Sequence, residues 1–181
     1  QVNPTDGSIA FATEAIPQYT GFPLLAYIRN NTGLSVIVEN DVNSAAIGEA
    51  FFGAAENLSD FLCLAYGTGI GGALFINGNL YRGFTGVAGE FGHIITHKDG
   101  IPCSCGQKGC YEMYASTSAL LRRAKEELGC SITGRELFAE RKNPAIRHLL
   151  SEWACEAAVG LVTLTHIFNP PALIIGGGFD S

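Results

Sequence analysis

Four residues with soft metal-ligand side chains gather in one short stretch of the chain. They are one histidine and three cysteines: His93, Cys103, Cys105 and Cys110. Zn²⁺ prefers thiolate and imidazole donors in a tetrahedron. Four protein ligands would leave no position for water, so the spacing predicts a structural zinc site. Two carboxylates, Glu90 and Glu112, bracket the cluster and are not needed as ligands, so both can face something else.

Two other interpretations of these cysteines compete with zinc. Free cysteine is often buried as a small apolar residue, and a single histidine is more often a core residue than a ligand. Three cysteines within eight residues, interleaved with Gly106 and Gly109, favour the metal instead. The odd local count of three and the lack of a secretory signal disfavour a disulfide.

A carboxylate that could act as a base follows a β-rich run. Residues 35–39 predict a strand, residues 44–52 predict a helix ended by Gly53, and Asn40 and Asp41 lie between them. Ligands of α/β folds bind at the carboxyl ends of strands, which places Asp41 well for chemistry. The alternative is that Asn40 or Asp41 is only a helix cap. The spacing alone leaves both interpretations open.

A glycine-rich turn separates two predicted strands, residues 61–66 and 73–76. It begins Gly67-Thr68-Gly69, and its backbone N–H groups and hydroxyl could approach an anion closely. No helix follows directly, so it is not a Walker loop, and a plain tight turn is the alternative. Asn77-Gly78 predicts a hairpin after the second strand.

The remaining pattern alternates helices with one more strand. Residues 22–28 predict a helix that ends near Gly33, and Ser116 or Thr117 caps a helix closed by Gly129. The basic pair Arg122-Arg123 in that helix predicts a solvated face. Further elements are a short helix from Gly134, a long helix from Pro144 to Asn169 with an apolar stripe for the core or a subunit interface, and a strand over residues 172–175 that leads into Gly176-Gly177-Gly178.

Composition limits the protein class. A chain of 181 residues suits one domain, and 47% apolar with 15% charged residues predicts a compact protein rather than a disordered one. A net charge of -6 argues against nucleic acid or an anionic membrane as a partner. No apolar run reaches the roughly 18 residues that span a bilayer. Cys63, Cys130 and Cys155 lie in apolar surroundings and predict buried thiols, which together with the other features suits a reducing cytoplasm.

These motifs resemble those of a known family. Glu90-x-x-His93, followed by Cys103-x-Cys105-Gly-x-x-Gly-Cys110-x-Glu112, resembles the signature of the ROK family, which contains bacterial glucokinases, fructokinases, N-acetylmannosamine kinases and sugar-responsive repressors. Residues 39–43, Glu-Asn-Asp-Val-Asn, are similar to the family's catalytic segment, and residues 169–178 to its adenosine-binding turn. The resemblance implies an α/β fold of the ribonuclease-H-like, actin-like ATPase kind, with this chain as the large carboxyl-terminal lobe and no Asp-x-Gly-x-Thr phosphate loop within it.

The resemblance also implies residue roles. Asp41 would be the general base for a sugar hydroxyl, and Asn40 would orient a neighbouring hydroxyl. Glu90, His93 and Glu112 would bind the sugar, with one ring nitrogen of His93 on zinc and the other towards the sugar. Mg²⁺-ATP would be held at two glycine-rich segments: Gly67, Thr68 and Gly69 at the phosphates, and Gly176 and Gly177 at the adenosine.

The expected activity is ATP-dependent phosphorylation of a hexose or N-acetylhexosamine at its 6-hydroxyl, by a homodimer that needs the amino-terminal lobe for transfer. The first alternative is the sugar-sensing lobe of a ROK transcriptional repressor, whose DNA-binding part would lie elsewhere. A zinc-stabilised sugar-binding module without catalysis is the second.

Overall fold

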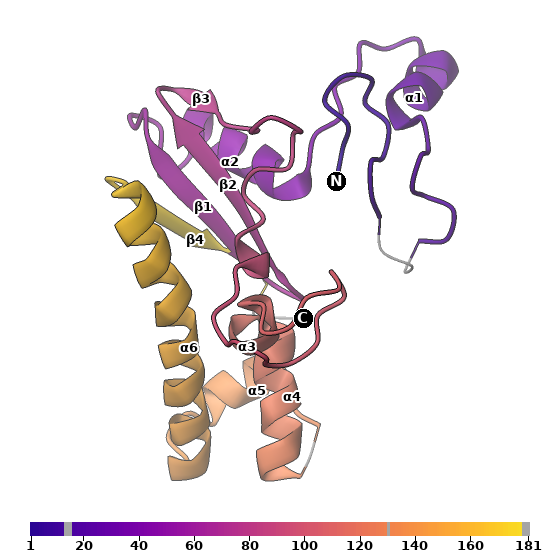
Figure 1. The fold of residues 1–181 in the computed structure, drawn as a ribbon. Helices are drawn as coiled ribbons and strands as arrows, with labels where there is room; N and C mark the ends of the chain where they lie inside the picture. Colours follow the sequence, from indigo (N-terminus) through magenta and orange to yellow (C-terminus); the bar gives the residue numbers. More distant parts are fainter. Residues whose placement is uncertain (13–15, 130, 179–181) are drawn as a thin grey trace. The chain divides into compact units, whose positions relative to one another are not determined.

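A computed structural model describes residues 1–12, 16–129 and 131–178 (Figure 1). The chain forms two compact units, each built from two segments. The first contains Gln1–Asp60 and Ala73–Gly89, and the second contains Phe61–Gly72 and Glu90–Ser181. None of the helices in the described residues combines the length and apolar character needed to cross a membrane.

The described residues of the first unit form two helices and most of a tight hairpin. Helix α1, Leu24–Thr32, ends as predicted at Gly33, whose φ of 68° is left-handed and whose N–H donates to the carbonyl of Arg29. Strands β2, Ile70–Ile76, and β3, Asn79–Leu80, pair in antiparallel fashion. Asn77 and Gly78 join them with φ values of 52° and 72°, the left-handed conformation that a two-residue hairpin needs.

The strand predicted over residues 35–39 is wrong. These residues belong to no helix or strand, and the side chain of Ile37 is 90% exposed. A β-branched run becomes a strand only where a neighbouring strand pairs with it, and this segment has no such partner among the described residues. The helix that follows begins earlier than predicted: α2 spans Asp41–Phe52, because Asn40 caps it.

The second unit contributes a buried parallel pair of strands. Strand β1, Phe61–Tyr66, is almost wholly buried and pairs in parallel with β4, Leu173–Gly176, in a register that sets Ala65 opposite Gly176. The strand order of the sheet is β3-β2-β1-β4, so the sheet is mixed. Because parallel strands end at the same edge, the glycines after β1 and those at the end of β4 lie next to each other.

The rest of the second unit is helical. Its elements are the 3₁₀ helix η1, Phe91–His93, and the α-helices α3, Glu112–Ala115; α4, Thr117–Leu128; α5, Gly134–Ala139; and α6, Pro144–Phe168. Ser116 and Gly129 cap α4 as predicted, and Asn143 accepts a hydrogen bond at the start of α6. Helices α4 and α6 lie side by side, with α5 joining their ends (Figure 1). Apolar residues of all three helices form one core cluster: Leu120, Ala124, Leu137, Ile146, Leu149 and Trp153.

The three cysteines outside the cluster have different environments. Cys63 is buried in β1, as predicted. Cys155 is exposed, so its prediction as a buried thiol is wrong. In α6 it lies about 200° around the helix from the buried Trp153, which turns it away from the core. Cys130 lies outside the described residues.

Candidate functional site

The structure brings the four predicted metal ligands together. The ligand atoms of His93, Cys103, Cys105 and Cys110 all lie within 4.8 Å of one another. The sulfurs of Cys105 and Cys110 are 3.5 Å apart, and the Cys103 sulfur is 3.7 Å from His93 Nδ1. Two thiolates bound to one tetrahedral zinc at about 2.3 Å would be separated by about 3.8 Å. The cluster therefore has the donor types and the spacing of a Cys₃His zinc site.

Backbone hydrogen bonds fold the segment around these ligands. Ile95 and Cys110 form an antiparallel bridge, and the N–H of Cys103 donates to the carbonyl of Gln107 at 2.9 Å. Gly109 has a φ of 79°, and a Cβ there would lie 1.6 Å from the carbonyl oxygen of His97. Only glycine fits this close backbone approach, which explains why the residue before Cys110 has no side chain.

The pKa is raised for two of the three cluster thiols and lowered for the third. Burial, with the neighbouring Cys105 and Cys103, raises the pKa of Cys110 to about 12. Burial is also the main cause of the raised pKa of Cys103, whereas the backbone N–H of Gln107 is the main cause of the lowered pKa of Cys105. A bound Zn²⁺ holds cysteine as thiolate, so loading of this site would release protons to solvent.

The three predicted sugar-binding residues converge beside the cluster. His93 lies between two carboxylates: its Nε2 is 3.8 Å from Glu90 Oε2 and its Nδ1 is 3.6 Å from Glu112 Oε1. The Cys103 thiol also donates to Glu112 Oε1 at 3.1 Å. Nδ1 thus faces the sulfur atoms, while Nε2 faces Glu90, which is half exposed. Two acceptor carboxylates around an imidazole form a surface suited to hydroxyl donors.

The glycine-rich turn after β1 packs directly against this group. The N–H of Ile70 donates to Glu112 Oε2 at 3.4 Å, and a Cβ on Gly69 would lie 2.5 Å from the same oxygen. A Cβ on Gly92 would lie 2.2 Å from the carbonyl oxygen of Ile70. Gly92 therefore has no room for a side chain, whereas a side chain at Gly69 would displace the Glu112 carboxylate. The N–H of Gly67 is already used within the turn, where it donates to Gly69 O at 2.9 Å.

The two glycine-rich segments predicted to hold a nucleotide lie at one edge of the sheet. Gly176 ends β4 opposite Ala65, and Gly177 follows with a φ of 118°. A Cβ on Gly177 would lie 1.9 Å from the carbonyl oxygen of Tyr66, so its backbone packs against the end of β1. Thr68 is exposed at the same edge, where its hydroxyl is accessible to a ligand.

A buried pair of tyrosines, which no sequence motif predicts, links the two sides of this site. The hydroxyls of Tyr66 and Tyr111 are 2.7 Å apart, and the Tyr111 hydroxyl donates to the carbonyl of Ala157 in α6 at 2.5 Å. A Cβ on Gly160 would lie 2.2 Å from the Tyr111 ring, so α6 comes unusually close here. The one signal in the sequence is position: Tyr66 precedes the glycine turn, and Tyr111 lies between a predicted zinc ligand and Glu112.

The predicted catalytic residues belong to the first unit. Asn40 is the N-cap of α2, with its Oδ1 accepting from the N–H groups of Val42 and Asn43 at 2.9 and 3.1 Å. The cap interpretation is thus confirmed for Asn40, and it leaves the side-chain NH₂ as the group that can meet a ligand. Asp41 is exposed at the first position of the helix, where one carboxylate oxygen accepts from Val42 N–H at 2.9 Å.

An ion pair between Glu39 and Arg82, forty-three positions apart in the sequence, supports the start of this helix. Arg82 Nε donates to Glu39 Oε2 at 2.9 Å, and the other oxygen of Glu39 accepts from Asn43 Nδ2 and from the N–H of Asn40. Partial burial acts to raise the pKa of Glu39, but these hydrogen bonds and the Arg82 charge hold it below its usual value. Glu39 stays ionised at neutral pH and fixes the turn that carries Asn40 and Asp41.

The chain is similar to known proteins of one family. The sequence model of the ROK family matches residues 1–181. A glucokinase of Streptomyces coelicolor is 38% identical over 177 residues, which cover 87% of this chain and 56% of that protein. The xylose repressor of Bacillus subtilis is 35% identical over 153 residues, which cover 84% of this chain and 40% of the repressor.

Among solved structures, a ROK family glucokinase from Streptomyces griseus in complex with glucose and AMPPNP matches with a TM-score of 0.88 and 37% identity, over 98% of this chain and 62% of that one. The chain therefore spans little more than half the length of the glucokinases it matches. The predicted fold class, α/β of the actin-like ATPase kind, is confirmed.

Proposed function

Because the chain belongs to the ROK family, we propose that it carries the sugar-binding and catalytic residues of an ATP-dependent sugar kinase. The substrate is a hexose or N-acetylhexosamine, and the chain corresponds to the larger, carboxyl-terminal lobe. The observation that carries the proposal is the convergence of Glu90, His93 and Glu112 beside the Cys₃His cluster. The similarity to glucokinases supports it.

Asp41 acts as the general base in this proposal. Its exposed carboxylate takes the proton from the 6-hydroxyl of the sugar, and the hydroxyl oxygen forms a bond to the γ-phosphorus of ATP. The bond between that phosphorus and the bridging oxygen breaks, and ADP leaves. The side-chain NH₂ of Asn40 donates to a neighbouring hydroxyl and orients the acceptor. Glu39 and Arg82 act through these residues, as positioning groups.

The second unit holds the sugar. Glu90 and Glu112 accept hydrogen bonds from its hydroxyls, and His93 Nε2 faces the same ligand. His93 Nδ1 and the three cysteines hold a structural Zn²⁺, which fixes the irregular segment from residue 93 to residue 110. A site that is already ordered binds its ligand at a lower entropic cost.

The glycine-rich segments receive Mg²⁺-ATP. Gly69 and Thr68 meet the phosphates, with Gly67 fixing the turn, and Gly176 and Gly177 meet the adenosine. The chain has a net charge of -6, so Mg²⁺ and local N–H donors must offset the repulsion between protein and nucleotide.

The similarity to the xylose repressor favours one second candidate, the sugar-sensing lobe of a repressor. A sensor needs the sugar-binding residues and the zinc site but does not need a base. Asp41 and the glycine turn are therefore the features that favour the kinase.

The test is ADP release over a panel of hexoses and N-acetylhexosamines, with binding of each sugar followed by thermal stabilisation. Turnover with one sugar that is lost in Asp41→Asn, while the sugar still stabilises the variant, supports the kinase. The matched control is Glu56→Gln, an exposed carboxylate in the first unit, which should keep full turnover. Sugar-dependent stabilisation without turnover of any sugar would instead favour the sensor.

A further inference from the structure

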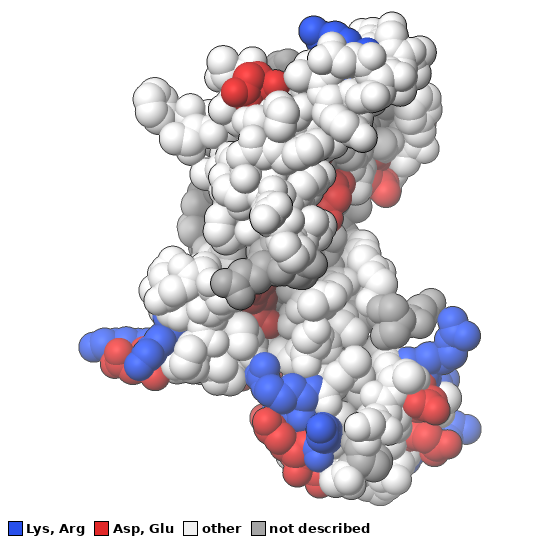
Figure 2. Space-filling view, turned by 90° about the vertical axis from the view of Figure 1, so that its right-hand side faces the viewer, with Lys and Arg blue, Asp and Glu red and all other residues white. Residues whose placement is uncertain are grey.

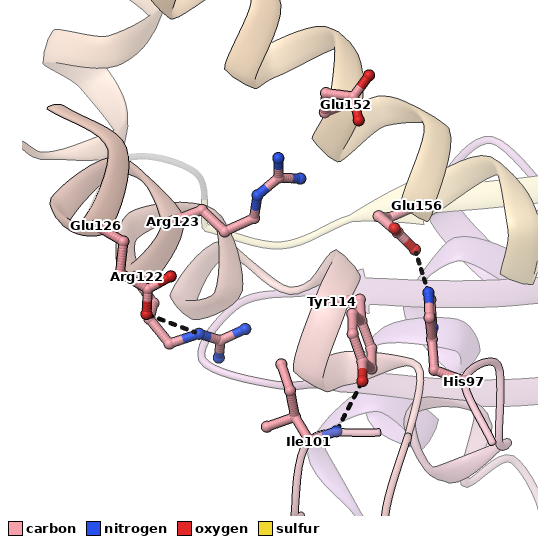
Figure 3. A pocket seen from close by; sticks show the side chains of 8 residues that line it. All are labelled: His97, Ile101, Tyr114, Arg122, Arg123, Glu126, Glu152 and Glu156. Carbon is pink, nitrogen blue, oxygen red and sulfur yellow. Dashed lines mark hydrogen bonds and ion pairs between the residues drawn. The ribbon is translucent and has the colours of Figure 1, made fainter. Parts of the chain in front are cut away.

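A hollow in the second unit lies outside the proposed sugar and nucleotide sites. It has a volume of about 370 Å³ and is lined by residues of α4, α6, α3 and the segment that follows His93 (Figure 3). Small-molecule sites begin at about 300 Å³, so the hollow is large enough for a compact ligand. Charged side chains of both signs gather over α4, α5 and α6 (Figure 2), and the hollow lies within this charged region.

The α4 wall presents guanidinium donors. Arg122 is held by a hydrogen bond from Nη2 to the carbonyl of Met113 at 2.5 Å, and Arg123 donates through Nε and Nη2 to Glu127 at 3.2 and 3.1 Å. Arg122 Nε also lies 4.0 Å from Glu126 Oε1 (Figure 3). Each guanidinium has five N–H donors, so both keep donors beyond these contacts. In Figure 3, Arg123 reaches from α4 towards α6 and Arg122 reaches towards Tyr114. The pair that the sequence predicted as a solvated face thus lines a hollow, with side chains 34% and 25% exposed.

The base of the hollow adds one more donor. The Tyr114 hydroxyl accepts from the N–H of Ile101 at 2.7 Å, which leaves its own hydrogen for a ligand. The ring of Tyr114 stacks on His97, with ring centroids 3.8 Å apart and an angle of 17° between the planes. Two guanidinium groups and a phenol around one space are the donors that bind a phosphate group.

The α6 wall has the opposite character. Glu152 and Glu156 are one helical turn apart and both line the hollow. Glu156 lies 3.6 Å from His97 Nε2, and Glu152 has no ion pair within the described part of the chain. Ionised carboxylates only accept hydrogen bonds, and two of them on one wall favour a ligand that brings positive charge.

The two walls together select the ligand. The hollow contains two guanidinium groups and three carboxylates, the third being Glu126. A ligand with only a phosphate group would be repelled by the carboxylates, and a ligand with only an ammonium group would be repelled by the arginines. We propose that the hollow is a binding site for a small zwitterionic phosphomonoester, a molecule with one phosphate and one ammonium group. Its phosphate lies against Arg122, Arg123 and Tyr114, and its ammonium group lies against Glu152 and Glu156.

The proposed site does not depend on the proposed kinase activity. None of its lining residues is among those assigned to sugar, nucleotide or zinc. It is nevertheless close to them along the chain: Tyr114 shares the single turn of α3 with Glu112, and His97 follows His93 by four residues. An occupant of the hollow would therefore contact the two segments that position the proposed sugar-binding residues.

Isothermal titration calorimetry of the whole zinc-loaded chain tests the proposal, with glucosamine 6-phosphate as the probe. Three related compounds each lack one of the two charged groups: glucose 6-phosphate and inorganic phosphate have no ammonium group, and glucosamine has no phosphate. We expect one site per chain and at least about tenfold weaker binding of each of these three, because each loses a charge-assisted contact.

Two substitutions locate the binding site. Glu152→Gln and Arg123→Gln should each weaken binding of the probe about tenfold. Glu152→Gln should leave the affinity for glucose 6-phosphate unchanged. Matched controls are Glu140→Gln and Arg147→Gln, exposed residues outside the hollow. Because an amino sugar phosphate could also bind as a kinase product, Glu112→Gln is titrated as well and should keep the affinity for the probe.

Three results would overturn the proposal: no heat from the probe, equal affinity for inorganic phosphate, or loss of binding in Glu112→Gln but not in Glu152→Gln. Failure of the kinase assay with normal probe binding would refute only the proposed function.

Discussion

Replacement of Tyr111 by phenylalanine tests how firmly the glycine turn, the metal cluster and α6 are joined. The substitution keeps the ring against Gly160 and removes only the hydroxyl. Two contacts disappear, the one to the carbonyl of Ala157 and the one to Tyr66. The Ala157 carbonyl keeps the bond that it accepts within α6, and the buried Tyr66 loses its hydrogen bond to Tyr111.

The expected loss follows from these contacts. A buried hydrogen bond contributes about 0.5–1.5 kcal/mol net, and the substitution removes two of them. Tyr111→Phe should therefore lower the free energy of unfolding by about 1–3 kcal/mol. Tyr66→Phe should cost less, about 0.5–1.5 kcal/mol, because Tyr111 keeps its bond to Ala157. The double variant should cost about 1 kcal/mol less than the sum, because the bond between the hydroxyls is lost only once.

Urea denaturation of the zinc-loaded chain at pH 7.5 measures these values. Tyr27→Phe is the matched control, since Tyr27 is 55% exposed, and it should change the unfolding free energy by less than about 0.5 kcal/mol. Burial raises the pKa of both Tyr66 and Tyr111. Their contribution to the free energy of unfolding is therefore complete below about pH 10, the pKa of an unfolded tyrosine, and falls as the pH rises further. A loss below about 0.5 kcal/mol, or strictly additive variants, would refute the reasoning.

Gly109→Ala should unfold the metal loop and prevent zinc retention, because its Cβ would lie 1.6 Å from the His97 carbonyl oxygen; metal content after gel filtration measures this. Gly106→Ala is the control, since Gly106 has a φ of 89° but a Cβ there would have nothing within 4 Å. It should keep its zinc and lose only about 1–2 kcal/mol of stability to backbone strain. Removal of zinc by a chelator should lower the melting temperature and abolish stabilisation by sugar. Cys110→Ser should behave in the same way, whereas Cys155→Ser, at an exposed position, should have no effect. Equal zinc content in the two cysteine variants would contradict this prediction. Glu39→Gln should lower stability at pH 7 by about 1 kcal/mol, because it weakens the contacts to Arg82 and Asn43. The pKa of Glu39 is lowered on folding, so its contribution to stability is present above the unfolded pKa of about 4.5 and is lost as the pH falls through the lower folded pKa. The unfolding free energies of the variant and the original chain should therefore converge as the pH falls well below 4.5, and a constant difference at all pH values would exclude this origin.

Local patterns in the sequence were enough for much of the fold. Ser116 and Gly129 mark the ends of α4 because caps satisfy the backbone groups that a helix end leaves unpaired, and this chemistry depends only on nearby residues. The hairpin at Asn77-Gly78 follows from φ values that few residue pairs adopt. The metal cluster was also predictable, because its four ligands lie within eighteen consecutive residues and zinc accepts few donor types.

Long-range pairing was beyond the sequence alone. Residues 35–39 have strand-forming side chains, yet a strand exists only where a partner from elsewhere in the chain pairs with it. The exposure of Cys155 depends on which face of α6 the core covers.

The sequence by itself determined which residues could bind a metal, accept a proton or end a helix, because those properties belong to side chains and their near neighbours. Only the tertiary structure decided which distant residues meet. It set the hydroxyl of Tyr66 against that of Tyr111, forty-five positions away, and placed the Arg122-Arg123 pair opposite Glu152 and Glu156 instead of in open solvent. Such meetings follow from the packing of whole helices and strands, and sequence spacing alone does not fix that packing.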